Sequence, residues 1–163
     1  MNKMTNTFQF VEITKDEHND FLLFLISVFE KMDTDKLKFN LDQSKYAYSL
    51  QNNKGEIIGG CWIRNFQINR YNIGGIGGVG IKSNYREKGL SRLLLERTIN
   101  QTSGLYDAYL VWTRSPAFFV KFGFEIFSRG IETQEGDSTP MLLPFHPELK
   151  DFAPSPQWPR IHF

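Results

Sequence analysis

Two glycine-containing segments near the middle of the chain have residue types that could bind a phosphate group. The first, Gly75 to Gly80, reads G-x-G-x-x-G, the pattern with which dinucleotide-binding enzymes hold a pyrophosphate. That chemistry requires a strand, a tight turn and a helix in direct succession, because the helix N-terminus binds the phosphates. The residues that follow, Ile81 to Tyr85, do not open a helix, which argues against a dinucleotide site.

The second segment, Arg86-Glu87-Lys88-Gly89-Leu90-Ser91, lies between an expected strand and a leucine-rich helix. Glycine lets the backbone approach a ligand closely, and the free amides of a first helical turn carry partial positive charge. Arg86 and Lys88 add two full charges. We therefore predict a short pyrophosphate-binding loop, here named the cradle (residues 86–91). An ordinary basic helix start is the alternative.

Apolar periodicity, turn residues and capping patterns predict the elements that position the cradle. Strands are expected over 8–13, 46–51, 56–68, 72–81, 108–112 and 124–128, with a further one near 141–145. Helices are expected from a capping box at Thr14 and Glu17 to about Met32, over 90–100, and from Ser115-Pro116 to a C-cap at Gly123. Residues 33–42 are polar and are expected to be irregular, and 52–55 to form a hairpin turn.

The composition limits the class of protein. The 163 residues suffice for one domain with a sizeable core, and a formal net charge of +1 argues against a nucleic-acid partner. Cys61 is the single cysteine, so there is no disulfide framework or CxxC metal site, and we expect it to be a buried small hydrophobe. The apolar run 21–29 is too short to span a bilayer, and the N-terminus lacks the apolar region of a signal peptide. We expect a cytoplasmic protein without a membrane partner.

The end of the chain differs in composition from the rest. Six of the seven prolines lie between Pro140 and Pro159, which excludes a regular helix or a central strand. Phe152, Trp158 and Phe163 make the segment too aromatic for a typical disordered tail. We expect a domain over 1–145 and an extended arm over 146–163 packed on it. A lid over a substrate cleft and an arm exchanged in a homodimer are the alternatives.

Two motifs give the sequence a resemblance to a known family. The run from Val79 to Ser91 is similar to the strand, [QR]-x-x-G-x-[GA] loop and helix of the GNAT superfamily of acyl-CoA-dependent N-acyltransferases. Ser91 replaces the usual Gly or Ala, and Ser83 stands where proline is frequent. The run from Phe119 to Phe124 looks like the family's aromatic-x-x-x-Gly-Phe block, and the element order over 8–128 also agrees. The resemblance implies an α/β fold with a mixed, mostly antiparallel central sheet flanked by helices, whose fourth and fifth strands splay apart.

The resemblance also implies a site for acetyl-CoA as co-substrate, without a metal. Pantetheine would lie between the splayed strands and bond to the backbone of Val79, Gly80 and Ile81. Glycine inside a strand often marks a ligand in close approach, so Gly77, Gly78 and Gly80 would line that space; a β-bulge without a ligand is the alternative. The pyrophosphate would bind the residues of the cradle: Arg86, Glu87, Lys88, Gly89, Leu90 and Ser91.

Acyl transfer to an amine requires a neutral amine, a donor for the carbonyl oxygen and a proton for the leaving thiolate. The backbone amide of Val79 or Gly80 is the candidate donor. The family's frequent acid is a tyrosine, and Phe119 occupies that position, so the catalytic acid and base are not assigned. Tyr85 and Tyr71 are weaker candidates for the acid. No covalent nucleophile is expected, which favours direct attack in a ternary complex.

A narrower similarity concerns the acceptor. Residues 113–124 resemble a stretch of bacterial N-acetylglutamate synthases that also carry phenylalanine at the tyrosine position. The guanidinium of Arg114 could hold a carboxylate by two hydrogen bonds, a solvated arginine being the alternative. The absence of Asp and Glu from 72–81 disfavours an acceptor as basic as a lysine side chain. We expect acetyl transfer to a primary amine of a small, amino-acid-like acceptor. A non-catalytic acyl-CoA-binding regulatory module and a nucleotide-dependent oxidoreductase are the alternatives.

Overall fold

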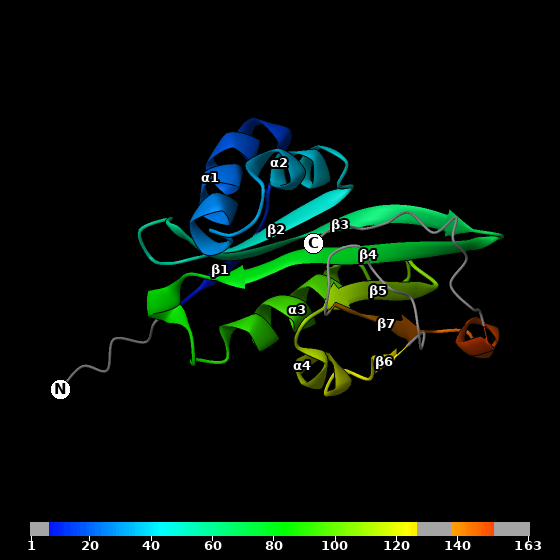
Figure 1. Cartoon of the computed structure of the whole chain (residues 1–163). Coiled ribbons are helices and arrows are strands. Elements are labelled where there is room, and N and C mark those ends of the chain that lie inside the picture. Colours follow the sequence, from blue (N-terminus) through cyan, green and yellow to red (C-terminus); the bar gives the residue numbers. More distant parts are fainter. Residues whose placement is uncertain (1–6, 127–137, 152–163) are drawn as a thin grey trace. The chain divides into compact units, whose positions relative to one another are not determined.

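The computed structural model describes residues 7–126 and 138–151, with side chains described as far as Leu149 (Figure 1). Within these ranges one seven-stranded sheet has the order β1-β2-β3-β4-β5-β7-β6. Strands β4 and β5 pair in parallel, whereas β1–β2, β2–β3, β5–β7 and β6–β7 pair antiparallel. The strands are β1 (Gln9–Glu12), β2 (Tyr46–Gln51), β3 (Ile57–Ile68), β4 (Tyr71–Ile81), β5 (Ala108–Thr113), β6 (Glu125–Ile126) and β7 (Thr139–Pro144). This confirms the expected mixed, mostly antiparallel α/β fold; residues 127 and 128 of the expected sixth strand lie outside the described ranges. The expectation that prolines exclude a central strand from 140 on is wrong for β7, which lies between β5 and β6. Its two prolines are tolerated because β6, as far as it is described, pairs only with Met141 and Leu142.

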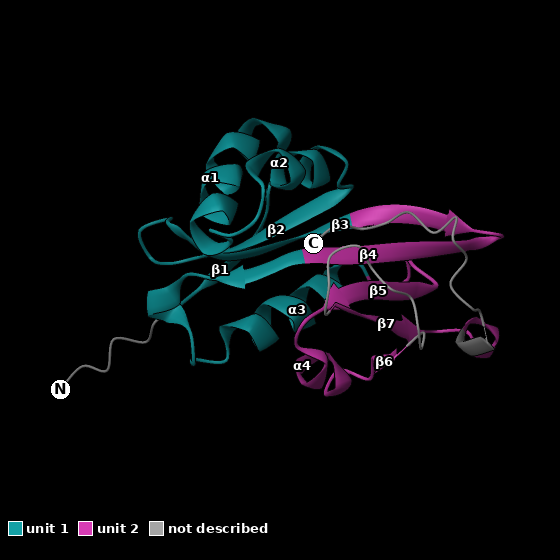
Figure 2. Ribbon diagram, in the orientation of Figure 1, with its two compact units in different colours: residues 1–63, 78–102 teal, residues 64–77, 103–163 magenta. Residues whose placement is uncertain are grey.

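The α-helices lie in the connections between β1 and β2, β4 and β5, and β5 and β6. They are α1 (His18–Val28), α2 (Thr34–Asp42), α3 (Leu90–Gln101) and α4 (Pro116–Val120), with 3-10 helices η1 (Lys15–Glu17), η2 (Ser83–Tyr85) and η3 (Pro147–Asp151). The chain divides into two compact units, residues 1–63 with 78–102 and residues 64–77 with 103–163 (Figure 2). Strands β3 and β4 each contribute residues to both units.

In unit 1, helices cover both faces of the sheet. Successive strand residues point to opposite faces, and neighbouring positions of β3 show which helix lies on each. A Cβ on Gly60 would lie 2.7 Å from Cζ of Phe21, a residue of α1. The next residue, Cys61, has its sulfur 3.3 Å from Oγ1 of Thr98 on α3. Helix α1 therefore packs on one face and α3 on the other, as Figure 1 also shows.

Unit 2 has its own apolar core. The core contains Tyr71, Ile73, Ala108, Leu110, Leu142 and Leu149. The hydroxyl of Tyr71 donates to Glu148 at 2.6 Å, and Nε2 of His146 lies 2.7 Å from Oδ1 of Asp107. The first residues of the expected arm thus pack on this unit, while residues 152–163 lie outside the described ranges. The domain boundary at 145 stays a prediction.

The structure corrects two expectations about the first helices. The helix expected to reach Met32 ends at Val28, because Phe29 leaves the helical region with φ −107° and ψ 57°. Residues 33–42, expected to be irregular, contain α2. The Asp33 side chain accepts a hydrogen bond from the amide of Asp35 at 2.8 Å, which caps the helix. Leu37 and Leu41, one turn apart, are buried and hold it in place.

Candidate functional site

Strand β4 pairs with β5 along only part of its length. Their parallel register is Ile73↔Ala108, Gly74↔Tyr109 and Gly75↔Leu110, although β4 continues to Ile81 and β5 to Thr113. The splay of β4 from β5 that the resemblance implies stays a prediction. Beyond the paired residues of β4, Ile76 and Gly77 belong to unit 2 and residues 78–81 to unit 1.

Two glycines in that segment make room for large side chains. Gly78 has φ +61°, and a Cβ there would overlap the indole of Trp62, lying 2.7 Å from Cη2 and closer to other ring atoms. A Cβ on Gly80 would lie 2.7 Å from Cγ1 of Val28 and 3.0 Å from Cζ of Phe29. The need for glycine at both positions follows from this packing and does not by itself require a ligand. The left-handed conformation of Gly78 changes the direction of the backbone just before Val79 and Gly80, as a β-bulge does.

The cradle has an irregular backbone that ends at the N-terminus of α3. Glu87 and Gly89 both have positive φ, +61° and +72°. Gly89 is the N-cap residue, and its carbonyl accepts from the amide of Leu93 at 3.1 Å to close the first turn. Among the described residues, the amides of Leu90, Ser91 and Arg92 have no hydrogen-bond partner. A Cβ on Gly89 would meet no atom within 4 Å, so the space in front of the cap is open. Free amides, open space and a helix N-terminus fit an anionic group such as a pyrophosphate.

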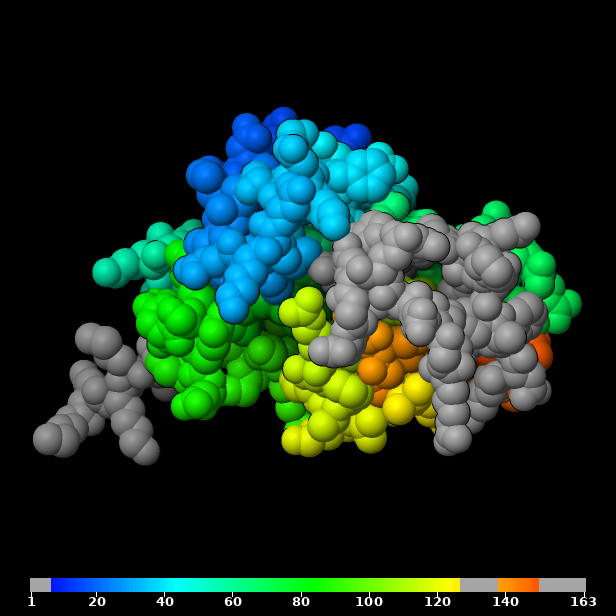
Figure 3. Space-filling model, viewed as in Figure 1, coloured from blue at the N-terminus to red at the C-terminus, as the bar shows by residue number. Residues whose placement is uncertain are grey.

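The side chains of the cradle supply positive charge at the surface. Arg86 through Gly89 are exposed, and the green segment after β4 lies at the surface in Figure 3. Nε of Arg86 donates to the carbonyl of Ile81 at 3.0 Å, which fixes the stem of that side chain. Nζ of Lys88 lies 5.3 Å from the ring centroid of Tyr85. Leu90 is buried and anchors the first helical turn. Glu87 carries the same sign as a phosphate, so only its backbone suits the ligand.

Two residues expected near the acceptor belong to unit 2. Arg114 follows β5, is exposed, and has no hydrogen-bond or ion-pair partner among the described residues. The turn that carries it is fixed by the Thr113 hydroxyl, which accepts from the amide of Ser115 at 2.8 Å. Phe119 is buried and packs edge to face against Phe124, with ring centroids 5.4 Å apart. The ring at the family's tyrosine position therefore has a packing role, and the guanidinium of Arg114 is unpaired within residues 7–126 and 138–149.

The remaining candidate groups contribute less. The Tyr71 hydroxyl is engaged with Glu148, and the Tyr85 hydroxyl accepts a hydrogen bond from Asn52 at 3.1 Å. Burial raises the pKa of the Cys61 thiol to about 12, against the opposing hydrogen bond to Thr98. This confirms that Cys61 is a buried hydrophobe, since a thiol with such a pKa is not a nucleophile near neutral pH. The described residues contain no group of three or more His, Cys, Asp or Glu that could hold a metal ion. None of the helices described here is long and apolar enough to cross a membrane.

The comparisons with known proteins assign the family. The model of an acetyltransferase (GNAT) domain matches residues 9–127. The chain therefore belongs to the GNAT acetyltransferases and is a GNAT N-acetyltransferase. A search of curated protein sequences gave no match. The local similarity of residues 113–124 to N-acetylglutamate synthases is not tested by these comparisons and stays a prediction.

Solved structures support the same fold. The GNAT family N-acetyltransferase YhbS from Escherichia coli, in complex with CoA, matches with a TM-score of 0.76 and 16% identity over 93% of this chain and 88% of that one. A GNAT family acetyltransferase from Brucella melitensis, in complex with acetyl-CoA, has a TM-score of 0.69 and 12% identity over 87% and 90%. A GNAT family acetyltransferase from Streptococcus pneumoniae has a TM-score of 0.63 and 23% identity over 85% and 99%.

The sequence did not indicate what holds the cradle from outside. Asn52, in the turn between β2 and β3, donates to the hydroxyl of Tyr85, 33 positions further along the chain. The Asn-Asn-Lys-Gly pattern indicates the turn, but it carries no information about a partner so distant in sequence. The contact of Asn52 with Tyr85, the residue just before the cradle, is therefore visible only in the three-dimensional structure.

Proposed function

We propose that this GNAT acetyltransferase moves the acetyl group of acetyl-CoA to the primary amine of a small, amino-acid-like acceptor, by direct attack in a ternary complex. The observation that carries the proposal is the N-terminus of α3. Its first amides have no partner among the described residues, and the space at the Cβ position of the N-cap residue, Gly89, is open. The motif at this place is the one through which the chain resembles the family's acyl-CoA-binding loop. The two related structures that hold CoA and acetyl-CoA support the choice of co-substrate.

Each part of the proposed site has one role. Acetyl-CoA supplies an activated thioester when it is bound. The amides of the cradle hold the pyrophosphate, with charge from Arg86 and Lys88, and the backbone of Val79 to Ile81 bonds to pantetheine. An amide of Val79 or Gly80 donates to the carbonyl oxygen, where negative charge develops during attack. In unit 2, Arg114 binds a carboxylate of the acceptor.

The acceptor must lose a proton without an assigned side-chain base. At pH 7 a peptide α-amine with a pKa near 7.8 is roughly one-tenth neutral, whereas a lysine amine near 10.4 is neutral in about one molecule in a few thousand. The difference is worth roughly 3.5 kcal/mol. A site whose β4 segment contains no carboxylate therefore favours an amine less basic than a lysine side chain, with water carrying the proton.

Isothermal titration with acetyl-CoA, and with NADH as a control, tests the co-substrate. We expect micromolar binding of acetyl-CoA and no binding of NADH. An assay of thiol release from acetyl-CoA, with a panel of amino acids and with lysine-containing peptides, then tests the acceptor. Turnover of lysine-containing peptides alone would contradict the amino-acid-like acceptor, and binding of NADH in place of acetyl-CoA would contradict the proposed co-substrate site. The homodimer and the cytoplasmic location stay predictions.

A further inference from the structure

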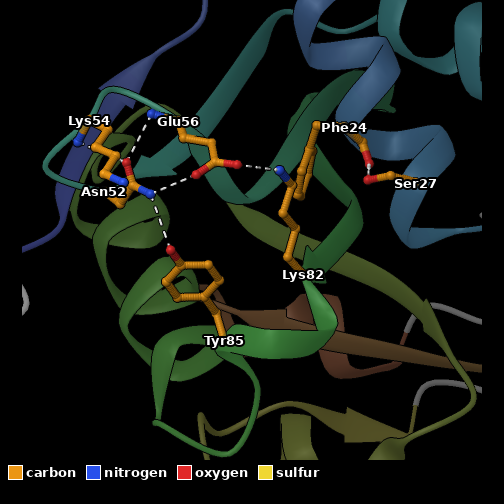
Figure 4. Close-up of polar contacts among 7 residues, drawn as sticks. All are labelled: Phe24, Ser27, Asn52, Lys54, Glu56, Lys82 and Tyr85. Carbon is orange, nitrogen blue, oxygen red and sulfur yellow. Dashed lines mark hydrogen bonds and ion pairs between the residues drawn. The ribbon is translucent and has the colours of Figure 1, made fainter.

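The turn between β2 and β3 contacts the segment that leads into the cradle. Figure 4 shows Asn52 at the centre of this contact. Its Oδ1 accepts from the amides of Lys54 at 2.9 Å and Glu56 at 3.0 Å, and its Nδ2 donates to Oε2 of Glu56 at 2.9 Å and to the hydroxyl of Tyr85 at 3.1 Å. An asparagine side chain has two donor hydrogens and two acceptor lone pairs, so every one of them is used. Asn52 therefore has a single favoured orientation.

A second contact from the same turn holds the other end of η2. The carboxylate of Glu56 lies 3.3 Å from Nζ of Lys82, the residue just before η2. The amide of Lys82 also donates to the carbonyl of Ile58 at 2.8 Å. Lys82 is the residue before η2 and Tyr85 is its last residue, so the β2–β3 turn contacts η2 at both ends (Figure 4). Both side chains that do this, Asn52 and Glu56, are bonded to each other.

Tyr85 links this contact to the cradle. It is the last residue before Arg86, and its ring packs edge to face on Phe8 with centroids 6.2 Å apart. Lys88, inside the cradle, places its ammonium group over the same ring. Residues 86–89 of the cradle are exposed, and two of them, Glu87 and Gly89, have positive φ, a conformation that costs free energy at Glu87. An exposed loop in a disfavoured conformation keeps its shape only where neighbouring residues hold it.

We propose that Asn52 is a positioning residue of the co-substrate site, which acts through Tyr85 to hold the cradle in the conformation that binds the pyrophosphate of acetyl-CoA. The inference rests on the proposed function. A loop that is ordered before the ligand arrives loses less conformational entropy on binding, and this raises affinity without any contact between Asn52 and the ligand. The contribution should appear in the Kd and KM for acetyl-CoA and not in kcat.

The test removes the hydroxyl that Asn52 holds. Tyr85→Phe keeps the ring that packs on Phe8 and lies under Lys88. Tyr46→Phe is the matched control, since Tyr46 is a half-buried tyrosine of β2 in the same unit, and its hydroxyl has no hydrogen-bond partner in the described part of the chain. Isothermal titration with acetyl-CoA should show a Kd about fivefold higher for Tyr85→Phe, the factor that one net hydrogen bond supplies, and an unchanged Kd for Tyr46→Phe.

Two further measurements separate positioning from general stability. In steady-state kinetics the KM for acetyl-CoA should rise by the same factor while kcat stays unchanged, and amide hydrogen exchange of residues 86–91 should become faster. A fall in kcat would give the Tyr85 hydroxyl the role of the acid and would overturn the inference. In the Asn52→Ala background, adding Tyr85→Phe should cause no further loss of affinity, because both changes remove one interaction.

The outcomes distinguish the inference from the function on which it rests. If the wild type binds acetyl-CoA and Tyr85→Phe binds it equally well while melting at a lower temperature, the hydroxyl is only structural and the inference is overturned. An equal loss of affinity in Tyr46→Phe overturns it as well. If the wild type itself does not bind acetyl-CoA, the proposed function is overturned and the inference with it.

Discussion

Gly89 is the residue at which the proposed co-substrate site is most open to a decisive test. Replacing it with valine places a branched side chain at φ +72° on the N-cap residue of α3, next in sequence to the first amides of the helix. A left-handed conformation costs an L-residue about 1–2 kcal/mol, and the new Cβ itself would meet no atom within 4 Å. Natural domains have a net stability of about 5–15 kcal/mol, so the variant should fold and melt about 2–8 °C lower.

The affinity of Gly89→Val for acetyl-CoA should fall by much more than its folding stability. The valine side chain would occupy the space that a pyrophosphate needs, and each charge-assisted hydrogen bond lost to it is worth about 1.5–3 kcal/mol. Loss of two such bonds weakens acetyl-CoA binding about 100-fold or more, which isothermal titration can measure. The result separates a binding role for the open cap from a purely conformational one.

Gly104 provides the matched control for this experiment. It has φ +82° with no atom within 4 Å of a Cβ, and it follows the other end of α3, a helix of 12 residues. Gly104→Val therefore introduces the same backbone strain about 18 Å of helix away from the cradle. It should lower the melting temperature by a similar amount and leave the Kd unchanged. Unaltered affinity in Gly89→Val, or equal losses in both variants, would refute the placement of the pyrophosphate at the cradle.

Four other changes test separate parts of the structure. Arg114→Ala should raise the KM of a carboxylate-bearing acceptor about tenfold or more and leave the Kd of acetyl-CoA unchanged; an equal effect on an acceptor without a carboxylate contradicts this role. Gly78→Ala should lower the free energy of unfolding by about 2–5 kcal/mol in urea titration, since it adds strain and overlap with Trp62, and near wild-type stability would contradict that packing. Cys61 should resist thiol reagents at pH 8 until the protein unfolds, because burial raises its pKa to about 12; rapid labelling of the native protein would show that the thiol is accessible. Hydrogen bonds from Asn52 and Lys82 lower the pKa of Glu56, so its carboxylate stabilises the fold above its usual pKa and this stabilisation is lost as the pH falls through the lowered value. Glu56→Gln should therefore reduce the loss of stability on acidification from about pH 7 to pH 3, as measured by urea unfolding.

Local patterns in the sequence predict most of the elements but not all of them. Every expected strand is present, because alternation and turn residues are encoded within a few positions. Helix α2 was missed because Thr34–Asp42 is mostly polar and buries few of its side chains. Asp33 as a capping residue and two leucines one turn apart, Leu37 and Leu41, do indicate a helix, but the polar composition of the segment favours an irregular loop. What stabilises this helix is packing on its partners, which a local pattern does not report.

The sequence likewise predicts one part of the candidate site and not the other. The cradle could be predicted, since a basic loop with glycine before an amphipathic helix is a local signal with a physical meaning. The reason for the glycines in β4 could not, because Trp62 and the end of α1 are the groups that require them. The contact from Asn52 to Tyr85 is likewise invisible to any local pattern. Both features depend on interactions between residues far apart in the chain, which a local sequence pattern does not report.

The glycines that receive large side chains also limit how this protein can vary. A methyl group on Gly60 would collide with Phe21, and one on Gly78 with the indole of Trp62. Neither glycine can be exchanged alone without moving its partner, and a smaller residue at Phe21 or Trp62 would leave a void in the core. Accepted changes at these positions should therefore arise in pairs, Gly60 with Phe21 and Gly78 with Trp62. Among relatives, these residue pairs should covary much more strongly than either residue does with its neighbours in the chain.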